Sequence, residues 1–273
     1  MNIIDIVNNI RKKKSFLCVG LDPDLSQLPK YLLDFEDPIF EFNKLIIDVT
    51  SDLCVAYKPN LAFYEKLGPA GLISLEKTLS YISDDHFVIA DAKRSDIFNS
   101  AQMYADTFYD YFDCDAVTLS PYMGFDAIKP FLRKDKWGII LIATSNPSAE
   151  SIQNIITQSG NPLYLDIVEK SNSWSSEEGI MFVVGATRTL EMSRIRLKSP
   201  NHFLLVPGIG AQGGDLGAVC DSAFSPNCGL IINVSRSIIY AGIGKDFKDM
   251  VRAACLNIQQ EMEFILKDKK FIF

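Results

Sequence analysis

The sequence predicts an α/β protein, a single-domain (β/α)8 TIM barrel, and three observations support this. Eight short apolar, strand-like segments alternate with helical segments along the 273 residues. Such alternation is typical of a parallel sheet, and eight units in about 250 residues are typical of a closed barrel. No linker or low-complexity stretch interrupts the alternation. We therefore expect residues 1–273 to form one barrel domain, with a short lead-in helix and a C-terminal helix.

The elements follow one another at a regular spacing. Short apolar runs, as expected for strands that are covered on both faces, predict strands at 16–21, 55–59, 87–92, 116–120, 138–144, 180–185, 203–206 and 230–234. Apolar residues at intervals of three and four predict helices at 5–14, 34–52, 69–82, 96–111, 124–133, 162–174, 190–197 and 246–266. We place Asp96 at the start of its helix, where an acidic side chain caps free N–H groups.

An open, doubly wound sheet is the alternative to a barrel. That fold carries its glycine-rich phosphate loop directly after the first strand. Here Asp22, Pro23 and Asp24 follow the first strand, and the glycines come after the seventh. The position of the glycines therefore favours the barrel.

The composition limits the classes of partner. The net charge of −7 weighs against a nucleic-acid partner, and no apolar run approaches the roughly 20 residues that cross a bilayer. The six cysteines have neither disulfide nor metal spacing, which favours a reducing, cytoplasmic location. His86 and His202 both precede apolar strands and are interpreted as structural. We expect no metal and no membrane.

Chemistry-bearing residues gather at the predicted carboxyl ends of the strands, where barrel enzymes place their active sites. They are Asp22, Lys58, Asp91, Lys93, Ser145, Gln212 and Arg236. The first four alternate in sign and are expected to form a buried charged network. A salt bridge at the mouth of the sheet explains Asp91 and Lys93 equally well when these two are taken alone. A surface pair contributes only about 0–1 kcal/mol, however, which is a weak reason to end so apolar a strand in charges.

Residues 207–214, with the sequence Pro-Gly-Ile-Gly-Ala-Gln-Gly-Gly, are a candidate phosphate loop. Glycines let the backbone approach an anion, and successive N–H groups form a concave anion site. A flexible turn is the alternative. Arg236, after the eighth strand, adds a forked cation that suits phosphate. Together the two segments predict a phosphate monoester as the ligand.

At this point the residues resemble a known family. The segment from Asp91 to Asp96 resembles the DxKxxD signature of the orotidine 5′-phosphate decarboxylases. The resemblance extends to Gly-Leu-Asp at 20–22, to Tyr-Lys-Pro-Asn at 57–60, to the glycine loop and to Arg236. Magnesium-dependent relatives carry an acidic metal ligand on the second strand, where this chain has Lys58. Ser235 stands where many members of the family have glycine.

The resemblance implies a cofactor-free decarboxylation of orotidine 5′-phosphate to uridine 5′-phosphate and carbon dioxide, in pyrimidine biosynthesis. It makes Lys93 the proton donor to carbon 6 and places Asp91 against the departing carboxylate. Lys58 and Asp96 complete the charged network, and Asp96 comes from the neighbouring subunit of a homodimer. The implied substrate-binding residues are Asp22 and Lys58 for the ribose, Ser100 from the partner chain, Ser145 for the pyrimidine, and Gln212 and Arg236 for the phosphate.

Three other functions stay open at this point. One is a Schiff-base lyase on the same barrel that uses Lys58 or Lys93, although Asp91 and Asp96 favour a charged ammonium rather than a nucleophilic amine. Another is a magnesium-dependent phosphosugar lyase. The last is a non-catalytic barrel that binds a phosphate ligand. We also expect residues 147–161 to act as a lid near the pyrimidine.

Overall fold

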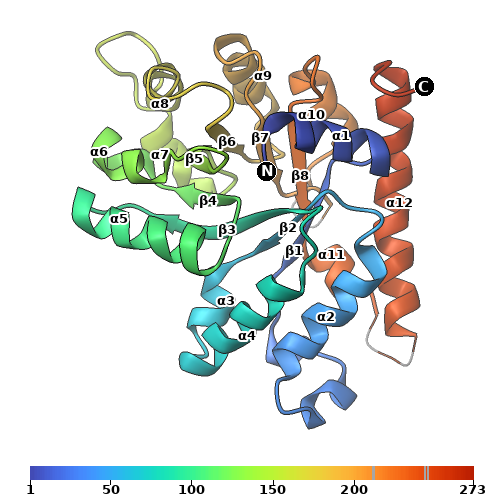
Figure 1. Cartoon of the computed structure of the whole chain (residues 1–273). Helices are drawn as coiled ribbons and strands as arrows, with labels where there is room; N and C mark the ends of the chain where they lie inside the picture. The colour runs from blue at the N-terminus through green and yellow to red at the C-terminus, as the bar shows by residue number, and fades with distance from the viewer. Residues whose placement is uncertain (211–212, 243, 245) are drawn as a thin grey trace.

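Eight parallel strands close into a barrel in chain order, which confirms the predicted fold (Figure 1). The computed structural model describes residues 1–210, 213–242, 244 and 246–273. Each strand pairs with the next, and β8 pairs with β1. The strands are β1 (Leu17–Leu21), β2 (Ala56–Pro59), β3 (Phe87–Arg94), β4 (Ala116–Leu119), β5 (Trp137–Ala143), β6 (Ile180–Val184), β7 (Leu204–Pro207) and β8 (Leu230–Val234).

Helices surround the barrel. In the described part of the chain they are α1 (Ile3–Lys13), α2 (Pro38–Thr50), α3 (Leu61–Glu65), α4 (Pro69–Tyr81), α5 (Phe98–Asp106), α6 (Phe125–Ile128), α7 (Glu150–Gln153), α8 (Leu163–Ser171), α9 (Thr189–Lys198), α10 (Leu216–Ala223), α11 (Arg236–Ile239) and α12 (Phe247–Asp268). The helix predicted at 124–133 is shorter than expected, because the chain tightens into a 3-10 turn around Pro130. Helix α10 was not predicted; Asp215 caps it by accepting the N–H of Ala218 at 2.6 Å.

The core explains why the strand segments are so apolar. Every residue of β1, β2, β4, β6 and β8 is buried. Large side chains such as Trp137 at the start of β5 and Phe42 on α2 are fully buried between the strands and the helices. Because helices cover the outer face and other side chains fill the inner face, neither face of these five strands meets water.

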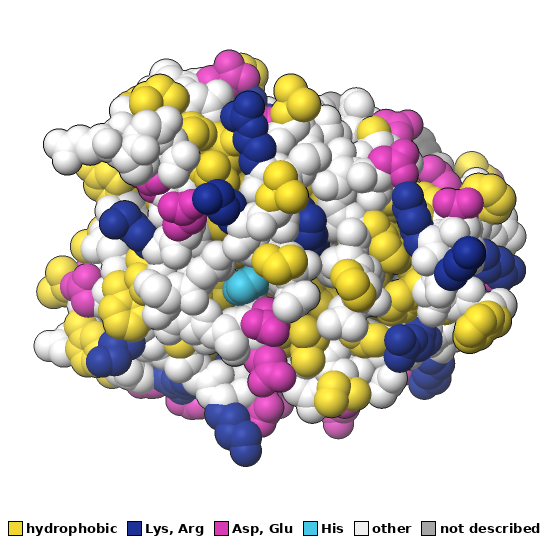
Figure 2. Space-filling view, turned by 90° about the horizontal axis from the view of Figure 1, so that it is seen from above, with side chains coloured by type: hydrophobic (Ala, Val, Ile, Leu, Met, Phe, Trp, Pro, Cys, Tyr) yellow, Lys and Arg dark blue, Asp and Glu magenta, His cyan; other side chains and the backbone are white. Residues whose placement is uncertain are grey.

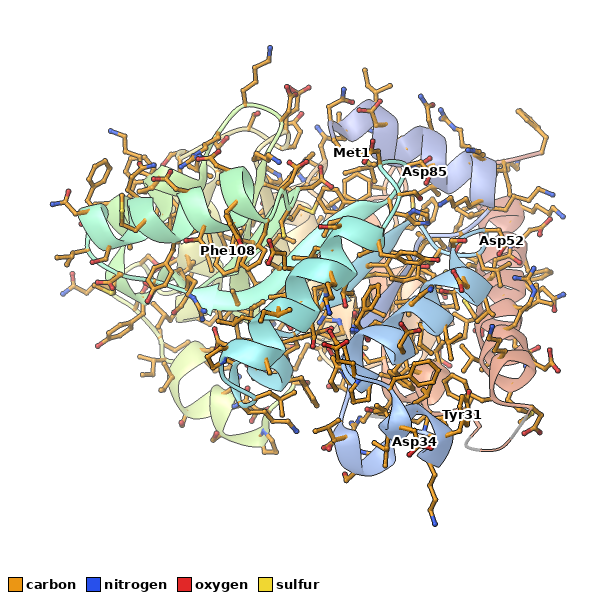
Figure 3. The ribbon with its side chains drawn as sticks, turned by 60° about the horizontal axis from the view of Figure 1, so that its bottom comes forward. Met1, Tyr31, Asp34, Asp52, Asp85 and Phe108 are labelled. Carbon is orange, nitrogen blue, oxygen red and sulfur yellow. The ribbon has the colours of Figure 1, made fainter. Side chains whose placement is uncertain are left out.

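The two ends of the barrel carry different segments. Helix α1 leads into β1, whereas α3 and α11 follow the carboxyl ends of β2 and β8. Figure 3 shows Met1 and Asp85 beside α1, and Tyr31 and Asp34 at the opposite end of the molecule. Seen from above, the surface mixes basic, acidic and apolar side chains (Figure 2). We call the two ends the amino end and the carboxyl end of the barrel.

Strand β3 departs from the prediction at its carboxyl end. It runs two residues further than expected, through Lys93 and Arg94, and its register with β4 shifts between Ala90 and Arg94. Placing Asp96 as a helix cap was wrong: the chain stays extended at Ile97, and α5 begins at Phe98. The carboxylate of Asp96 instead accepts the N–H of Ile97 at 2.7 Å.

Candidate active site

Two lysines share one carboxylate at the carboxyl end of the barrel. The Nζ of Lys58, on β2, lies 2.9 Å from Oδ2 of Asp91. The Nζ of Lys93, two residues along β3, lies 2.6 Å from Oδ1 of the same side chain. Lys58 is 4% exposed, whereas half of the Lys93 side chain faces solvent. Asp91 therefore holds one buried ammonium and one ammonium that remains open to a ligand.

The charges in this network stabilise one another. Burial alone raises the pKa of Asp91, but the charges of Lys58 and Lys93 outweigh it and hold the pKa well below its ordinary value. Burial likewise lowers the pKa of Lys58, and the neighbouring Asp91 and Asp22 reverse this, so that the pKa lies above the ordinary lysine value. Lys58 and Asp91 are consequently both ionised at neutral pH.

Thr118 on β4 belongs to the same cluster, although we did not predict it. Its hydroxyl donates to Oδ1 of Asp91 at 2.9 Å and accepts the backbone N–H of Lys93 at 2.9 Å. A threonine in a strand gives no signal in the sequence, because β-branched residues are common there. The only usable signal was its place two residues before the predicted end of the fourth strand.

A cavity of about 180 Å³ opens beside the network. Its lining includes four of the predicted site residues, namely Asp22, Lys58, Asp91 and Arg236, together with Asn60, Pro207, Gly208, Ile209, Asn233, Ser235 and Ser237. Asp22 lies just after β1 and accepts the N–H of Asn60 at 3.2 Å. The cavity thus joins the charged network to the segments that follow β7 and β8.

The glycine loop after β7 has the backbone that its sequence demands. Gly208 has a φ of +105°, which a residue with a side chain rarely adopts. Gly214 donates to the carbonyl of Gly208 at 3.1 Å, and a Cβ on Gly214 would lie 2.4 Å from the Cβ of Ala186. The glycines are therefore required by the tight turn itself. The predicted phosphate ligand Gln212 lies outside the described residues.

Ser235 is accommodated by Gly20 on the neighbouring strand β1. A Cβ built on Gly20 would lie 1.8 Å from the Ser235 hydroxyl oxygen. That hydroxyl also accepts Nδ2 of Asn233 at 3.3 Å. The serine side chain thus fills space over β1.

The remaining predicted residues in the described part of the chain are not among those that line the cavity, although Lys93 contacts Asp91, which does. Asp96 precedes α5, Ser100 lies on α5, and Lys93 and Ser145 are also absent from the residues that line the cavity. Within the described ranges no lysine or arginine forms an ion pair with Asp96. The expected lid region contains α7, where Oε1 of Gln153 accepts the N–H of Thr144 at 3.0 Å and so ties the helix to the end of β5.

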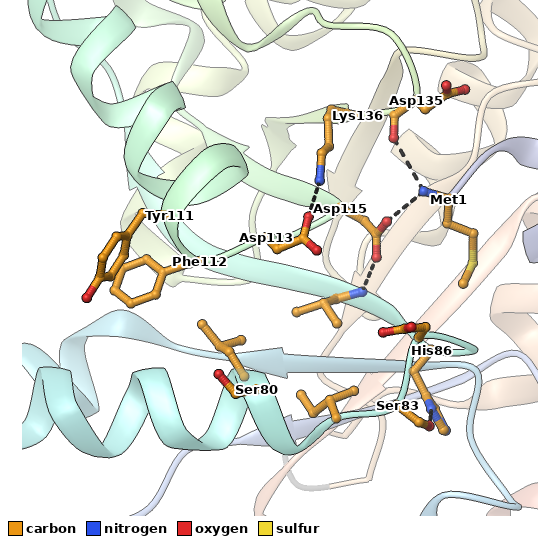
Figure 4. A pocket seen from close by; sticks show the side chains of 14 residues that line it. Met1, Ser80, Ser83, His86, Tyr111, Phe112, Asp113, Asp115, Asp135 and Lys136 are labelled. Carbon is orange, nitrogen blue, oxygen red and sulfur yellow. Dashed lines mark hydrogen bonds and ion pairs between the residues drawn. The ribbon is translucent and has the colours of Figure 1, made fainter.

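A larger cavity, of about 510 Å³, lies at the amino end (Figure 4). Four acidic side chains line it, together with one lysine and the terminal ammonium of Met1. The acidic residues are Asp84, Asp113, Asp115 and Asp135, and the lysine is Lys136. The ammonium of Met1 lies 2.6 Å from Oδ1 of Asp115, and Nζ of Lys136 lies 2.9 Å from Oδ1 of Asp113. The excess of carboxylates repels a phosphate, so we assign the active site to the carboxyl end despite its smaller cavity.

Comparison with known proteins agrees with this geometry. The model of the orotidine 5′-phosphate decarboxylase / HUMPS family matches residues 15–246. Orotidine 5′-phosphate decarboxylase of Parabacteroides distasonis is 49% identical over 276 residues, covering 100% of this chain and 99% of the relative. The enzyme of the same name from Bacteroides fragilis is 50% identical over 271 residues, covering 98% of this chain and 99% of the relative.

Solved structures give the same result. A putative orotidine-monophosphate-decarboxylase from Toxoplasma gondii matches with a TM-score of 0.84 and 31% identity, covering 95% of this chain and 97% of that one. The UMP synthase of Leishmania donovani matches with a TM-score of 0.85 and 35% identity, covering 96% of this chain and 56% of that one. The chain therefore belongs to the orotidine 5′-phosphate decarboxylase / HUMPS family.

Proposed function

We propose that this protein converts orotidine 5′-phosphate into uridine 5′-phosphate and carbon dioxide, a step of pyrimidine biosynthesis. The observation that carries the proposal is the Lys58–Asp91–Lys93 network beside the glycine loop of β7. The network supplies fixed charges for the reacting carbon, and the loop together with Arg236 suits the phosphate at the far end of the substrate.

The reaction needs stabilisation of negative charge on ring carbon 6. In the proposed mechanism the carboxylate leaves as carbon dioxide, and its bonding electron pair stays on carbon 6. The Lys93 ammonium stabilises this charge more than it stabilises the neutral ring, and it then donates the proton that completes uridine 5′-phosphate. Its exposed side chain suits a donor that must meet a ligand.

Asp91 adds repulsion to the ground state. Its carboxylate is kept ionised by two ammonium groups, so a substrate carboxylate placed beside it meets a fixed negative charge. Two unit charges 4 Å apart interact by about 4 kcal/mol at an effective dielectric of 20. Since 1.36 kcal/mol is tenfold in rate, this repulsion supplies about a thousandfold at most. The remaining acceleration has to come from Lys93 and from binding energy.

Binding energy from the phosphate supports the chemistry at a distance. We propose that Arg236 and Gln212 hold the phosphate, Asp22 and Lys58 the ribose hydroxyls, and Ser145 the pyrimidine edge. Arg236, Asp22 and Lys58 line one cavity, which supports their acting on one ligand. Interactions with the non-reacting phosphate can offset the repulsion at the carboxylate.

We propose that the reaction needs no metal or cofactor. The supporting observation is chemical. Where magnesium-dependent relatives have an acidic metal ligand, this chain has Lys58, and the Lys58 ammonium lies 2.9 Å from Asp91. A second cation in that space would be repelled by Lys58.

We further propose a homodimer with shared active sites. Around α5 and α6 several large apolar side chains are exposed, and they are Ile97, Phe98, Met103, Tyr104, Tyr122, Met123 and Phe125. Such a surface suits an interface between subunits. Asp96 and Ser100 lie in the same region. A partner subunit packed against this surface therefore brings these two residues near the cavity of the facing subunit. Asp96 is then the fourth member of the charged network, contributed across the interface.

We propose that the whole chain acts as one cytoplasmic domain. All six cysteine thiols are buried and form no disulfide, which suits a reducing compartment. No helix among the described residues is long and apolar enough to span a membrane.

The test is an ultraviolet assay on EDTA-treated protein mixed with orotidine 5′-phosphate. We expect the pyrimidine absorbance to change rapidly with the wild-type protein. We expect Lys93→Ala to lower kcat by at least about 10³-fold, in the upper range for a lost proton donor, while uridine 5′-phosphate still binds. Binding of the product, measured by calorimetry, separates loss of chemistry from loss of the site.

Absence of turnover with the wild-type protein would reject the proposed reaction. Activity that appears only when Mg²⁺ is restored would point to a metal-dependent lyase. A stable adduct after borohydride treatment with a sugar phosphate would point to a Schiff-base enzyme instead.

A further inference from the structure

Lys93 has a backbone conformation that residues with side chains seldom adopt. Its φ is +50°, in the left-handed region, where a lysine remains only if its surroundings hold it. The strand pairing changes at the same place: Ala90 pairs with Val117, whereas Arg94 pairs with Leu119. Between these two pairs β3 advances four residues and β4 only two. The regular ladder therefore cannot fix Lys93.

Thr118 is the β4 residue that lies opposite this irregularity. Its hydroxyl accepts the N–H of Lys93 and donates to Oδ1 of Asp91, both at 2.9 Å. The direction of each bond is fixed, because an amide only donates and an ionised carboxylate only accepts. Thr118 is 1% exposed, and its branched Cβ restricts rotation about χ1. The hydroxyl is thus held firmly in the one place where the ladder is interrupted.

These bonds close a ring around the proposed proton donor. The ring runs from the Lys93 amide through Thr118 to Asp91, and returns through the Lys93 ammonium, which lies 2.6 Å from the same oxygen of Asp91. We propose that Thr118 is a positioning residue that fixes Asp91 and the Lys93 backbone so that the Lys93 ammonium meets carbon 6. This inference rests on the proposed function, because it assigns a role within that reaction.

A buried hydroxyl also has an ordinary role, namely to satisfy other buried polar groups of the fold. Thr78 on α4 shows that role. It is fully buried, donates to the carbonyl of Ser74 at 2.7 Å and accepts Nδ2 of Asn43 at 3.0 Å. Thr78 has the same residue type, burial and number of hydrogen bonds, but contacts no residue of the charged network. It provides a matched control.

The experiment compares Thr118→Val, Thr118→Ser and Thr78→Val. Valine keeps the shape and removes the hydroxyl, whereas serine keeps the hydroxyl. We expect Thr118→Val to lower kcat by about 10- to 100-fold, the usual effect of misplacing a reacting group by about 1 Å. We expect KM and the affinity for uridine 5′-phosphate to change little, because Arg236 and the glycine loop are untouched. Thr118→Ser should recover most of kcat, and Thr78→Val should leave kcat unchanged.

The pH profile of kcat gives a readout that a structural role would not move. Losing the Thr118 hydrogen bond removes a donor that favours the ionised form of Asp91. Any acid limb of the profile that belongs to Asp91 therefore shifts to higher pH in Thr118→Val, and not in Thr78→Val.

Several results would overturn the inference. One is a Thr118→Val protein that keeps the wild-type kcat and the wild-type acid limb of the pH profile. Another is a Thr118→Ser protein whose kcat is as low as that of Thr118→Val. If Thr118→Val does not fold, as judged by its thermal unfolding, Thr118→Ala removes the same hydroxyl and is held to the same expectations. A wild-type protein that does not turn over orotidine 5′-phosphate rejects the proposed function instead, so the two failures are distinguishable.

Discussion

Both ends of this barrel bury a lysine, and the two lysines have opposite surroundings. At the carboxyl end Lys58 contacts the carboxylate of Asp91, and its pKa is raised. At the amino end Lys13 donates to the carbonyl of Ser51 at 3.0 Å and lies 2.7 Å from Nε2 of His86. Burial lowers the pKa of Lys13, and Asp85, 3.6 Å away, compensates only in part. The partner, rather than burial itself, decides whether a buried charge is favoured.

The difference separates the proposed catalytic use of charge from a structural one. The carboxyl end keeps paired charges fixed in place, so that they need not reorganise during the reaction. The amino end holds both histidines, His86 before β3 and His202 before β7, and burial lowers the pKa of each. The ring of His86 hydrogen-bonds to Ser51 and Ser83, whereas the ring of His202 stacks on Phe182. Both rings are mainly neutral at pH 7. We therefore expect substitutions at the two ends to affect different quantities.

The largest expected contrast in stability is between Lys58→Met and Lys13→Met. Removing Lys58 leaves a buried carboxylate with one ammonium fewer, and breaking such a pair typically costs about 3–5 kcal/mol in the free energy of unfolding. Removing Lys13 loses two hydrogen bonds but also removes an ammonium that is poorly stabilised, so we expect about 1 kcal/mol. Urea unfolding measures both values.

The turnover of the same two variants should differ as well. Lys58→Met should abolish most turnover in the protein that remains folded, whereas Lys13→Met should retain the wild-type kcat. Equal losses of stability for the two variants would show that the pairing with Asp91 does not make Lys58 more important for stability than Lys13.

Two arginines allow a second comparison, of intermediate size. Arg236 is exposed and lines the candidate active-site cavity. We expect Arg236→Ala to lower kcat by about 10- to 100-fold as well as raising KM, because phosphate binding energy is used at the reacting carbon. Its free energy of unfolding should stay within about 0.5 kcal/mol of the wild-type value, as for other surface changes. An increase in KM alone would contradict the proposed use of the phosphate.

Arg196 gives the opposite expectation. Its guanidinium donates to main-chain carbonyls of His202 at 2.6 Å, Ala223 at 2.8 Å and Gly229 at 2.9 Å, and so joins the end of α9 to the starts of β7 and β8. Hydrogen bonds that involve a charged group contribute about 1.5–3 kcal/mol each. Burial of the guanidinium, which lowers the pKa of Arg196 to about 10, offsets much of the sum of these bonds. We therefore expect Arg196→Met to lower the free energy of unfolding by about 2–3 kcal/mol and to leave kcat of the folded protein unchanged. A lower kcat would mean that the amino end transmits strain to the site.

Much of this organisation was predictable from sequence, for physical reasons. The strands are predictable because burial on both faces requires apolar runs, and residues such as Asp22, Lys58 and Arg236 interrupt or follow those runs at the same end of the barrel. Their convergence on one cavity then follows from the parallel topology. The glycine loop is predictable because its backbone has positive φ angles that glycine accommodates.

The errors arose where tertiary contacts override local pattern. The charges of Lys93 and Arg94 suggested the end of β3, but the strand continues because Thr118 holds the irregular pairing. Asp96 looked like a helix cap, yet the helix begins after Ile97. Thr118 itself was missed since its role depends on a register shift between two strands, which no local pattern contains.

The smallest expected effect tests the amino end through pH. Burial lowers the pKa of His202 to about 4, and its ring stacks on Phe182 with centroids 5.2 Å apart. An unfolded histidine titrates near 6.5, so between about pH 6.5 and 4 the unfolded chain binds more protons than the folded one. The stability that neutral His202 provides is therefore present above about pH 6.5 and is lost as the pH falls towards 4.

The variant His202→Phe removes this titration and keeps a flat ring against Phe182. We expect the fall in the free energy of unfolding between pH 7 and pH 5 to be smaller than in the wild type by about 1 kcal/mol, after allowance for incomplete burial. His86 remains and keeps part of the dependence. The Asp91 network does not contribute in this range, because a carboxylate with a lowered pKa loses its stabilising effect only below the unfolded value of about 3.9. If the free energy of unfolding of His202→Phe fell with pH as much as that of the wild type, the loss of stability would come from protonation of groups other than His202.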